Sequence, residues 1–233
     1  MTALKFWKGA NRWYDRIVIF FLVIVLLIVC YCMYDNYWVY NHTLDKSILK
    51  YKPGTENYDA AASPISSDMV AWLTIDDTNI DYPVMQADDN IKYLNTDPYG
   101  KYSLTGSIFL DSRNSPDFSD DYSLIYGHHM EYGKMFGALD EFLDESYLRK
   151  HSRGELLIGR DGSKKLKLRF FASMKAKASD NAVFNVNAGG IKDFIDNNSS
   201  VKISEPKGRI VALSTCSDSD SVTRVVVFCY LVD

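Results

Sequence analysis

The sequence lacks the features that would place it in several common functional classes. Its four cysteines have neither the spacing of a disulfide framework nor that of a zinc site. Its formal net charge of -4 gives no basic surplus, which argues against a nucleic-acid-binding protein. It has no internal repeat or low-complexity segment, and the aspartate pairs at 88–89 and 120–121 lack EF-hand spacing. We therefore expect a fold that needs no disulfide, metal or cofactor, with those aspartates in solvated turns.

One long apolar run, residues 17–33, contains no charged residue and lies near the N-terminus. Its length suits a helix that spans a bilayer, and aromatic residues that follow it suit the lipid–water interface. The basic residues before it are Lys5, Lys8, Arg12 and Arg16. Positive charges stay inside, so we expect a cytoplasmic N-terminus and an extracellular remainder. A cleaved signal peptide is the alternative, but no small-residue cleavage site follows the run, which favours an uncleaved anchor.

The remainder is expected to form one domain, because 233 residues with 47% hydrophobic content leave a single core once the membrane segment is set aside. We expect four parts: a cytoplasmic tail at 1–16, a transmembrane anchor at 17–38, a juxtamembrane helical segment at 39–64 and a compact domain at 65–233. An amphipathic helix is predicted over 35–58, ending near the Lys-Pro-Gly sequence at 52–54.

Many short strands and few helices are predicted in the compact domain, which favours a closed or nearly closed β-barrel. The predicted strands are 70–75, 80–85, 107–111, 123–126, 155–158, 165–175, 209–215 and 222–232. Short helices are predicted at 136–142, 145–150 and 191–197. Pro83 is expected to place its strand at an edge or a bulge, because proline cannot donate to a ladder.

The penultimate predicted strand ends in a thiol, Cys216, and a short polar loop separates it from the last strand. An antiparallel hairpin of this kind brings Arg224 back beside Cys216. A thiol next to a fixed positive charge is suited to act as a nucleophile, because only the thiolate attacks and a cation favours it. The alternative for Arg224 is a surface ion pair with Asp218 or Asp220, which would contribute little.

The other cysteines have simpler interpretations. Cys229 lies inside the apolar last strand and is interpreted as a packed core residue. Cys30 and Cys32 lie in the apolar N-terminal run, where they would face lipid or carry a palmitoyl group. Only Cys216 is therefore left as a candidate nucleophile.

Two of the four histidines lie side by side in Tyr126-Gly127-His128-His129-Met130. An imidazole can donate and accept protons near neutral pH, so His128 is a candidate general acid and base. His129 is interpreted as a solvated or supporting residue. His42 and His151 are expected at surface positions near helices.

Taken together, these residues resemble a class B sortase, from about Val70 to the C-terminus. The motifs that carry the resemblance are Ala71-Trp72-Leu73, Tyr82-Pro83-Val84, Tyr93-Leu94-Asn95, Gly106-Ser107-Ile108-Phe109, Tyr126-Gly127-His128 and Leu213-Ser214-Thr215-Cys216. The specific part is a Thr-Cys pair at a strand end with an arginine on the next strand. The loop between Cys216 and Arg224 is shorter than in some members of the family.

The resemblance implies a mainly β fold, a sortase-type closed β-barrel of about eight strands with N-terminal helices and a single transmembrane helix. It also implies a helix in the long loop before the penultimate core strand, where 191–197 is predicted. The implied activity is that of a membrane-anchored cysteine transpeptidase. Such an enzyme cleaves an NPxTG-like C-terminal sorting signal after Thr through a Cys thioester, and transfers the protein to an amine of a cell-wall precursor.

Roles follow from the same motifs. Cys216 resembles the nucleophile, His128 the catalytic histidine and Arg224 the essential arginine. Three further residues match positions that line the substrate groove: Leu94, Ser214 and Thr215. The implied partners are surface proteins that carry a sorting signal and a peptidoglycan-precursor amine, at the cell membrane of a Gram-positive bacterium with the catalytic domain outside.

Three alternatives stay open from the sequence. The acceptor could be a pilin lysine, which would make the protein a pilin-polymerising enzyme. Water could resolve the thioester, which would make it a hydrolytic cysteine endopeptidase. The barrel could also be a non-catalytic surface domain that binds peptide.

Overall fold

The computed structural model describes residues 2–42, 46–56, 58–130, 133–216 and 223–232. These residues fall into two compact units, Met1–Asp45 and Lys46–Asp233. The first is helical and the second contains all the strands, and each is described by itself.

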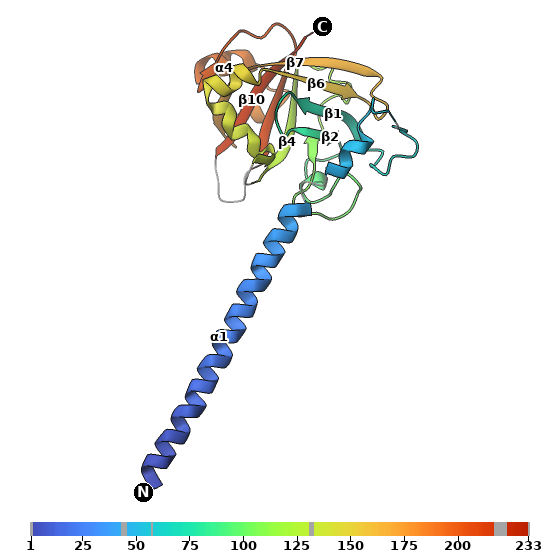
Figure 1. Ribbon diagram of the computed structural model, residues 1–233. Helices are drawn as coiled ribbons and strands as arrows, with labels where there is room; N and C mark the ends of the chain where they lie inside the picture. The colour runs from blue at the N-terminus through green and yellow to red at the C-terminus, as the bar shows by residue number, and fades with distance from the viewer. Residues whose placement is uncertain (1, 43–45, 57, 131–132, 217–222, 233) are drawn as a thin grey trace. The chain divides into compact units, whose positions relative to one another are not determined.

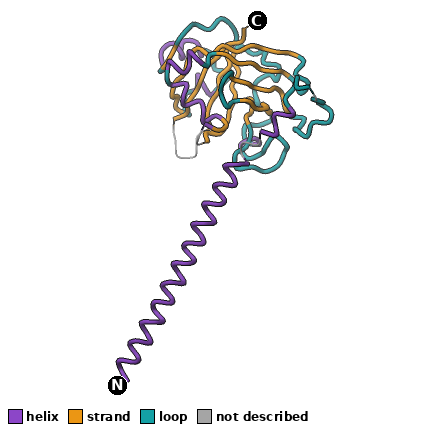
Figure 2. Tube along the Cα trace, viewed as in Figure 1, coloured by secondary structure: helices purple, strands orange, loops and turns teal. Residues whose placement is uncertain are grey.

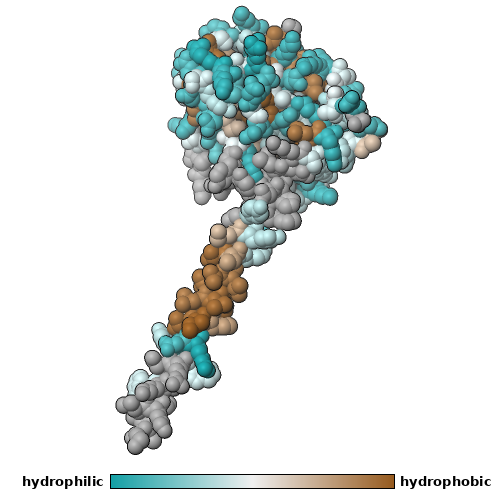
Figure 3. All heavy atoms as spheres, viewed as in Figure 1, coloured by the Kyte–Doolittle hydropathy of each residue, from teal (hydrophilic) through white to brown (hydrophobic). Residues whose placement is uncertain are grey.

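The first unit consists of one helix, α1 (Thr2–His42). Its section Trp13–Asp35 has a mean hydropathy of 3.1, and apolar residues cover this part of the helix (Figure 3). Nearly all side chains in this section are exposed. A helix that is apolar on every side is typical of one surrounded by lipid, so the section is compatible with the predicted membrane anchor.

The helix predicted over 35–58 does not form as one element. Helix α1 passes residue 35 without a break and continues to His42, whereas a short 3-10 helix, η1 (Lys46–Tyr51), follows in the second unit. Pro53 cannot donate a backbone hydrogen bond, and Gly54 has a φ of 84°, a left-handed conformation that glycine adopts at little cost. The predicted helix end near 52–54 is therefore confirmed. The prediction of one continuous helix over 35–58 is wrong.

A closed barrel forms the second unit (Figure 1). The strands are β1 (Met69–Ile75), β2 (Asp81–Met85), β3 (Ile108–Leu110), β4 (Tyr122–Met130), β5 (Lys134–Met135), β6 (Arg153–Ile158), β7 (Lys164–Lys177), β8 (Val201–Lys202), β9 (Ile210–Cys216) and β10 (Thr223–Val232). The order is β10-β9-β4-β3-β2-β1-β6-β7, and β10 also pairs with β7. These eight strands close the ring and confirm the predicted eight-stranded barrel, in which parallel and antiparallel pairs are mixed.

Strands β5 and β8 lie outside the ring, paired with β4 and β7 respectively. Helical segments connect the strands, among them η2 (Lys92–Leu94), η4 (Phe136–Leu143), α2 (Glu145–Lys150), α3 (Asn181–Phe184) and α4 (Ile191–Asn198). Both α3 and α4 belong to the long connection between β7 and β9 (Figure 2). The helix predicted at 191–197 is thus confirmed as α4.

Apolar side chains at strand positions supply the core. The segment that follows η1 is linked to this core through Trp72 and Asp81. Trp72 in β1 is fully buried, and burying a side chain of this kind contributes roughly 1.5–3 kcal/mol. Its indole Nε1 donates to Asp81 Oδ1 at 2.6 Å. Lys52 Nζ, just after η1, donates to the same oxygen at 2.9 Å, so the polar end of the tryptophan finds a partner inside the barrel wall.

Pro83 does not place its strand at an edge, because β2 lies between β1 and β3. Strand β3 pairs only with Val84 and Met85, so the missing N–H of Pro83 interrupts no ladder on that side. The β1–β2 register does shift nearby, between Met69 and Ala71. The predicted edge is wrong; the alternative prediction, a bulge, agrees with this register shift, which lies opposite Val84 and Met85, directly after Pro83.

His151 is not a surface residue as predicted. It is 5% exposed, and its ring packs on that of Tyr147 with a centroid distance of 4.2 Å. Its Nδ1 lies 3.2 Å from the carbonyl oxygen of Asp76. The cause is tertiary, because this residue follows α2 where the chain turns toward the β1–β2 turn. The side chain of His42 lies outside the described residues.

Candidate active site

Two parallel strands, β4 and β9, bring the predicted histidine and cysteine together. Their register pairs His128 with Cys216, and Cys216 is the last residue of β9. Side chains alternate between the two faces of a strand, so Tyr126 and Ser214 lie on the same face as this pair. The structure describes the backbone of Cys216 and not its side chain. Two residues 88 positions apart in the chain are therefore neighbours in the sheet.

Strand β10 brings Arg224 to the same place. It pairs antiparallel with β9 through Val226 and Ser214, and the same register continued by two residues sets Arg224 opposite Cys216. Thr215 Oγ1 accepts a hydrogen bond from Val225 N at 3.1 Å, which holds the hairpin together at this point. The predicted hairpin is confirmed, while Asp218 and Asp220, the alternative partners of Arg224, lie outside the described residues.

Arg224 is half-buried and held chiefly by a ring. Its guanidinium carbon lies 5.1 Å from the ring centroid of Phe184 in α3, within the range of a cation–π interaction. Its Nε is buried and has no hydrogen-bond partner among the described residues. The guanidinium therefore has unused donors on the face of the sheet that it shares with His128 and Cys216.

Gly127 allows the neighbouring elements to pack closely against β4 directly before His128. A Cβ at Gly127 would lie 2.7 Å from Phe136 Cδ2 and would also clash with the side chain of Ile108. A glycine here lets η4 and β3 pack directly against β4, which fixes the strand just before His128. Strand β4 itself extends to Met130, beyond the predicted end at residue 126, so the histidine sits on a strand and not in a turn.

A buried carboxylate lies next to this face. Asp111 is fully buried and accepts hydrogen bonds from Arg113 Nε at 2.8 Å, Arg113 Nη2 at 2.7 Å and Asn90 Nδ2 at 3.0 Å. Burial alone would raise the pKa of Asp111, but these bonds outweigh it and hold the pKa below its ordinary value. Tyr126 Oη donates to the same carboxylate at 3.2 Å.

The charge of Arg224 reaches this cluster. Burial and the carboxylate of Asp111 raise the pKa of the Tyr126 phenol, whereas the charges of Arg113 and Arg224 oppose the rise. Tyr126 therefore stays protonated and donates its hydrogen bond at neutral pH. Hydrogen bonds thus join Arg113, Asp111 and Tyr126, and the charge of Arg224 acts on Tyr126 through space.

The residues predicted to line a groove differ in their exposure. Ser214 and Thr215 are buried; the Ser214 hydroxyl donates to the carbonyl oxygen of Thr215 at 3.1 Å. Thr215 alternates to the opposite face of β9 from Ser214. Leu94, in η2, is half-buried and packs against the core.

Two further predicted roles are supported by burial. His129 is exposed, and its Nε2 lies 2.8 Å from Asp140 Oδ2, as suits a solvated or supporting residue. Cys229 is fully buried, its Sγ lies 3.3 Å from the carbonyl oxygen of Val211, and burial raises the pKa of its thiol. Cys229 is therefore a core residue, as predicted.

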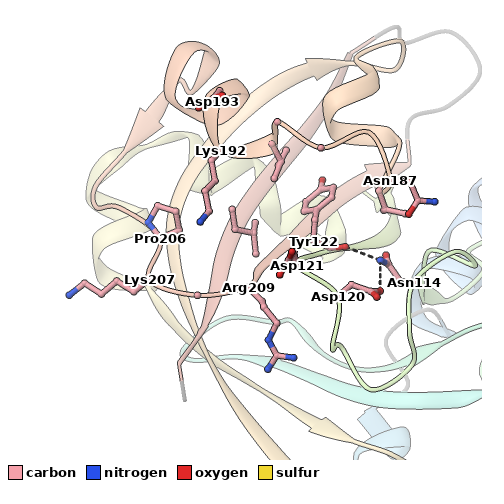
Figure 4. Close-up of a pocket in the computed structure, with 16 residues that line it drawn as sticks. Asn114, Asp120, Asp121, Tyr122, Asn187, Lys192, Asp193, Pro206, Lys207 and Arg209 are labelled. Carbon is pink, nitrogen blue, oxygen red and sulfur yellow. Dashed lines mark hydrogen bonds between the residues drawn. The ribbon is translucent and has the colours of Figure 1, made fainter.

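Two of the cavities on the described part of the second unit lie away from Cys216. One of about 590 Å³ is bordered by His129, Asp140 and the β1–β2 turn. The other, of about 1160 Å³, lies between the β7–β9 connection and the starts of β4 and β9, at Tyr122 and Ile210 (Figure 4). Those starts are at the opposite end of the two strands from His128 and Cys216. Among the described residues, no cluster of three His, Cys, Asp or Glu side chains could hold a metal ion.

Sequence reasoning missed several residues of this face. Asp111, Arg113 and Phe184 were not singled out, and Tyr126 was quoted only as part of the Tyr-Gly-His motif, without a role of its own. A carboxylate at the end of a predicted strand, with a guanidinium two positions later, was a usable signal for the ion pair. Phe184 gave no signal, because its contact with Arg224 depends on a connection that folds back from 40 positions earlier in the chain.

Comparison with known proteins agrees with this geometry. The sortase domain family matches residues 73–232. Sortase B of Staphylococcus aureus (strain NCTC 8325 / PS 47) is 32% identical over 180 residues, which cover 72% of each chain. Among solved structures, Spy0129, a Streptococcus pyogenes class B sortase involved in pilus biogenesis, is 38% identical with a TM-score of 0.68, covering 77% of this chain and 99% of that chain. A Staphylococcus aureus sortase B–substrate complex is 28% identical with a TM-score of 0.65, covering 72% and 82%.

Proposed function

The chain belongs to the class B sortases, and from that premise we propose that it is a membrane-anchored cysteine transpeptidase. It cleaves an NPxTG-like C-terminal sorting signal after Thr and transfers the protein to an amine of a cell-wall precursor. The observation that carries this proposal is the β4–β9 register, which pairs His128 with Cys216. A barrel that only bound peptide would not require a histidine and a cysteine to be neighbours in the sheet.

The proposed chemistry proceeds in two halves through a thioester. The Cys216 thiolate attacks the Thr carbonyl carbon, and the carbonyl oxygen becomes an oxyanion. Arg224 donates hydrogen bonds to that oxyanion with a charge that is always present. His128 gives a proton to the leaving amine as the C–N bond breaks, and the Cys216 thioester remains.

In the second half an acceptor amine attacks the thioester carbon. His128 takes the proton that the amine releases, a new amide bond forms and the Cys216 thiolate leaves. In this scheme every proton is transferred, and every bond is formed or broken, by a side chain of this chain or by an atom of a substrate. The proposed groove residues are Leu94, Ser214 and Thr215, of which Ser214 and Thr215 directly precede Cys216 on β9.

A pilin lysine is the second candidate for the acceptor amine. The observation that favours it is the likeness to Spy0129, whose description places it in pilus biogenesis. In both cases the acceptor is a primary amine, so the proposed chemistry of the Cys216 thioester is the same.

Transfer and hydrolysis are separated by the products. Incubated with a sorting peptide and an added amine, the wild-type protein is expected to release the C-terminal fragment and join the amine to Thr, because an amine is a far better nucleophile than water at neutral pH. Mass spectrometry of the products with and without amine measures this. A product that never contains the amine, at any amine concentration, would establish the hydrolytic endopeptidase instead.

We also propose the arrangement at the membrane: residues 1–16 in the cytoplasm, 17–38 across the bilayer, 39–64 as the juxtamembrane segment and 65–233 as the extracellular catalytic domain. The apolar section of α1, Trp13–Asp35, supports a single span, and the basic residues before it support this orientation.

Deletion of residues 1–33 is expected to give a soluble protein with full activity on a peptide substrate. The reason is that the barrel closes and buries its core entirely within Lys46–Asp233. Size-exclusion chromatography, circular dichroism and peptide cleavage measure the outcome. An aggregated or unfolded product would contradict the proposed boundary.

A further inference from the structure

We propose that Phe184 is a positioning residue that aims the guanidinium of Arg224, an inference that rests on the proposed function of Arg224. The observation is the contact of the two side chains across two elements, with the Arg224 guanidinium carbon 5.1 Å from the Phe184 ring centroid. Phe184 ends α3, and Arg224 lies near the start of β10. The ring belongs to the long β7–β9 connection and not to the barrel wall.

The ring is needed because little else in the described part of the chain orients this arginine. Arg224 forms no ion pair with any described carboxylate, and its buried Nε has no hydrogen-bond partner there. The buried carboxylate of the same face, Asp111, is engaged by both Nε and Nη2 of Arg113. An arginine has several rotatable bonds, and fixing them costs entropy unless packing restricts them. A ring face restricts the guanidinium plane without using any of its N–H donors.

Phe184 can do this because the barrel holds its backbone. Tyr122 Oη donates to the carbonyl oxygen of Val183 at 2.9 Å. Arg113 Nη2 donates to the carbonyl oxygen of Phe184 at 2.9 Å, and Nη1 donates to Asn185 Oδ1 at 3.3 Å. A helix as short as α3 is not stable by itself, so these bonds place it. The Asp111–Arg113 pair thus connects the end of β3 to the ring that contacts Arg224.

The consequence is specific to the transition state. A guanidinium that must meet a developing oxyanion has to be held within about 0.5 Å of the productive position. Losing its ring would let it adopt other rotamers and would weaken an interaction that is made fully only as charge develops. We therefore expect the effect of a Phe184 variant mainly in kcat and only weakly in KM.

The test compares Phe184→Leu, Phe184→Tyr and a matched control, Phe194→Leu, in the full-length protein in detergent micelles. Leucine keeps an apolar side chain but has no ring face, so kcat/KM for the sorting peptide should fall about five- to thirtyfold, the range of a partly desolvated cation–π contact. Tyrosine keeps the ring and should stay within about twofold of wild type. Phe194, on α4, packs against the same core without a contact to Arg224, so its variant should retain wild-type kcat.

A double-mutant cycle separates positioning from general destabilisation. In an Arg224→Ala background the Phe184→Leu change should cost less than about twofold, because the group it positions is gone. A similar loss in both backgrounds, wild-type activity of Phe184→Leu, or an equal loss for Phe194→Leu would each overturn the inference. If Arg224→Ala itself keeps wild-type rates, the proposed function of Arg224 fails, and the inference fails with it. An Arg224→Ala variant that is inactive beside an unaffected Phe184→Leu variant would refute the inference alone.

Discussion

Replacement of Cys216 by alanine is expected to lower turnover of a sorting peptide by at least about a thousandfold, because removing a covalent nucleophile leaves only binding and electrostatic effects. Peptide affinity should stay within about threefold of wild type, since the groove and Arg224 are untouched. Release of the peptide fragment measures turnover, and fluorescence anisotropy of a labelled peptide measures affinity. A large loss of turnover with almost unchanged peptide affinity distinguishes a nucleophile from a residue that only lines the groove.

Cys229→Ala is the matched control. Cys229 is the other cysteine of the same hairpin, fully buried in β10, and burial raises the pKa of its thiol, so it is unsuited to nucleophilic attack. Its loss should lower thermal stability slightly while turnover per folded molecule stays at the wild-type level. Retained turnover in Cys216→Ala would remove this residue from the chemistry and favour the non-catalytic peptide-binding barrel.

Local sequence patterns predicted much of the fold because the barrel strands bury apolar residues along their length. The strand predicted at 70–75 is found at Met69–Ile75, and that predicted at 209–215 at Ile210–Cys216. The β9–β10 hairpin followed from adjacency in the chain alone. The pairing of His128 with Cys216 did not, because a parallel pair joins strands that the sequence separates widely. The resemblance to a family supplied that link, and the β4–β9 register gives it a physical form.

What the sequence could not supply depends on tertiary contacts. His151 looked like a surface residue after a short helix, yet the chain covers it with the ring of Tyr147 and the β1–β2 turn. Asp111 was only the last residue of a predicted strand, yet it is fully buried and bonded to Arg113. In both cases the residue type indicates exposure. Hydrogen-bond partners contributed by other parts of the chain offset the cost of burying the polar side chain.

Arg224→Lys is expected to lower kcat by about a hundred- to a thousandfold, the cost of losing a donor to a developing oxyanion. Lysine keeps the charge, so a purely electrostatic role for this residue predicts a much smaller loss. Its ammonium is a point charge on a flexible stem and cannot present two parallel N–H donors in one plane. The flat face that packs on the ring of Phe184 at 5.1 Å is lost as well. Steady-state kinetics with a sorting peptide, and titration of that peptide in a Cys216→Ala background, separate kcat from binding.

Arg209→Lys controls for the general cost of exchanging an arginine in this barrel. Arg209 lies just before β9, at the end away from Cys216, and makes a hydrogen bond from Nη1 to the carbonyl oxygen of Phe118 at 2.8 Å. A lysine can donate there too, so this variant should keep wild-type kcat and lose little stability. If Arg224→Lys also kept wild-type kcat, charge alone would suffice and the planar fork would have no part in the reaction. A large loss in Arg224→Lys beside an unaffected Arg209→Lys would place the oxyanion within reach of β10, opposite the residue that ends β9.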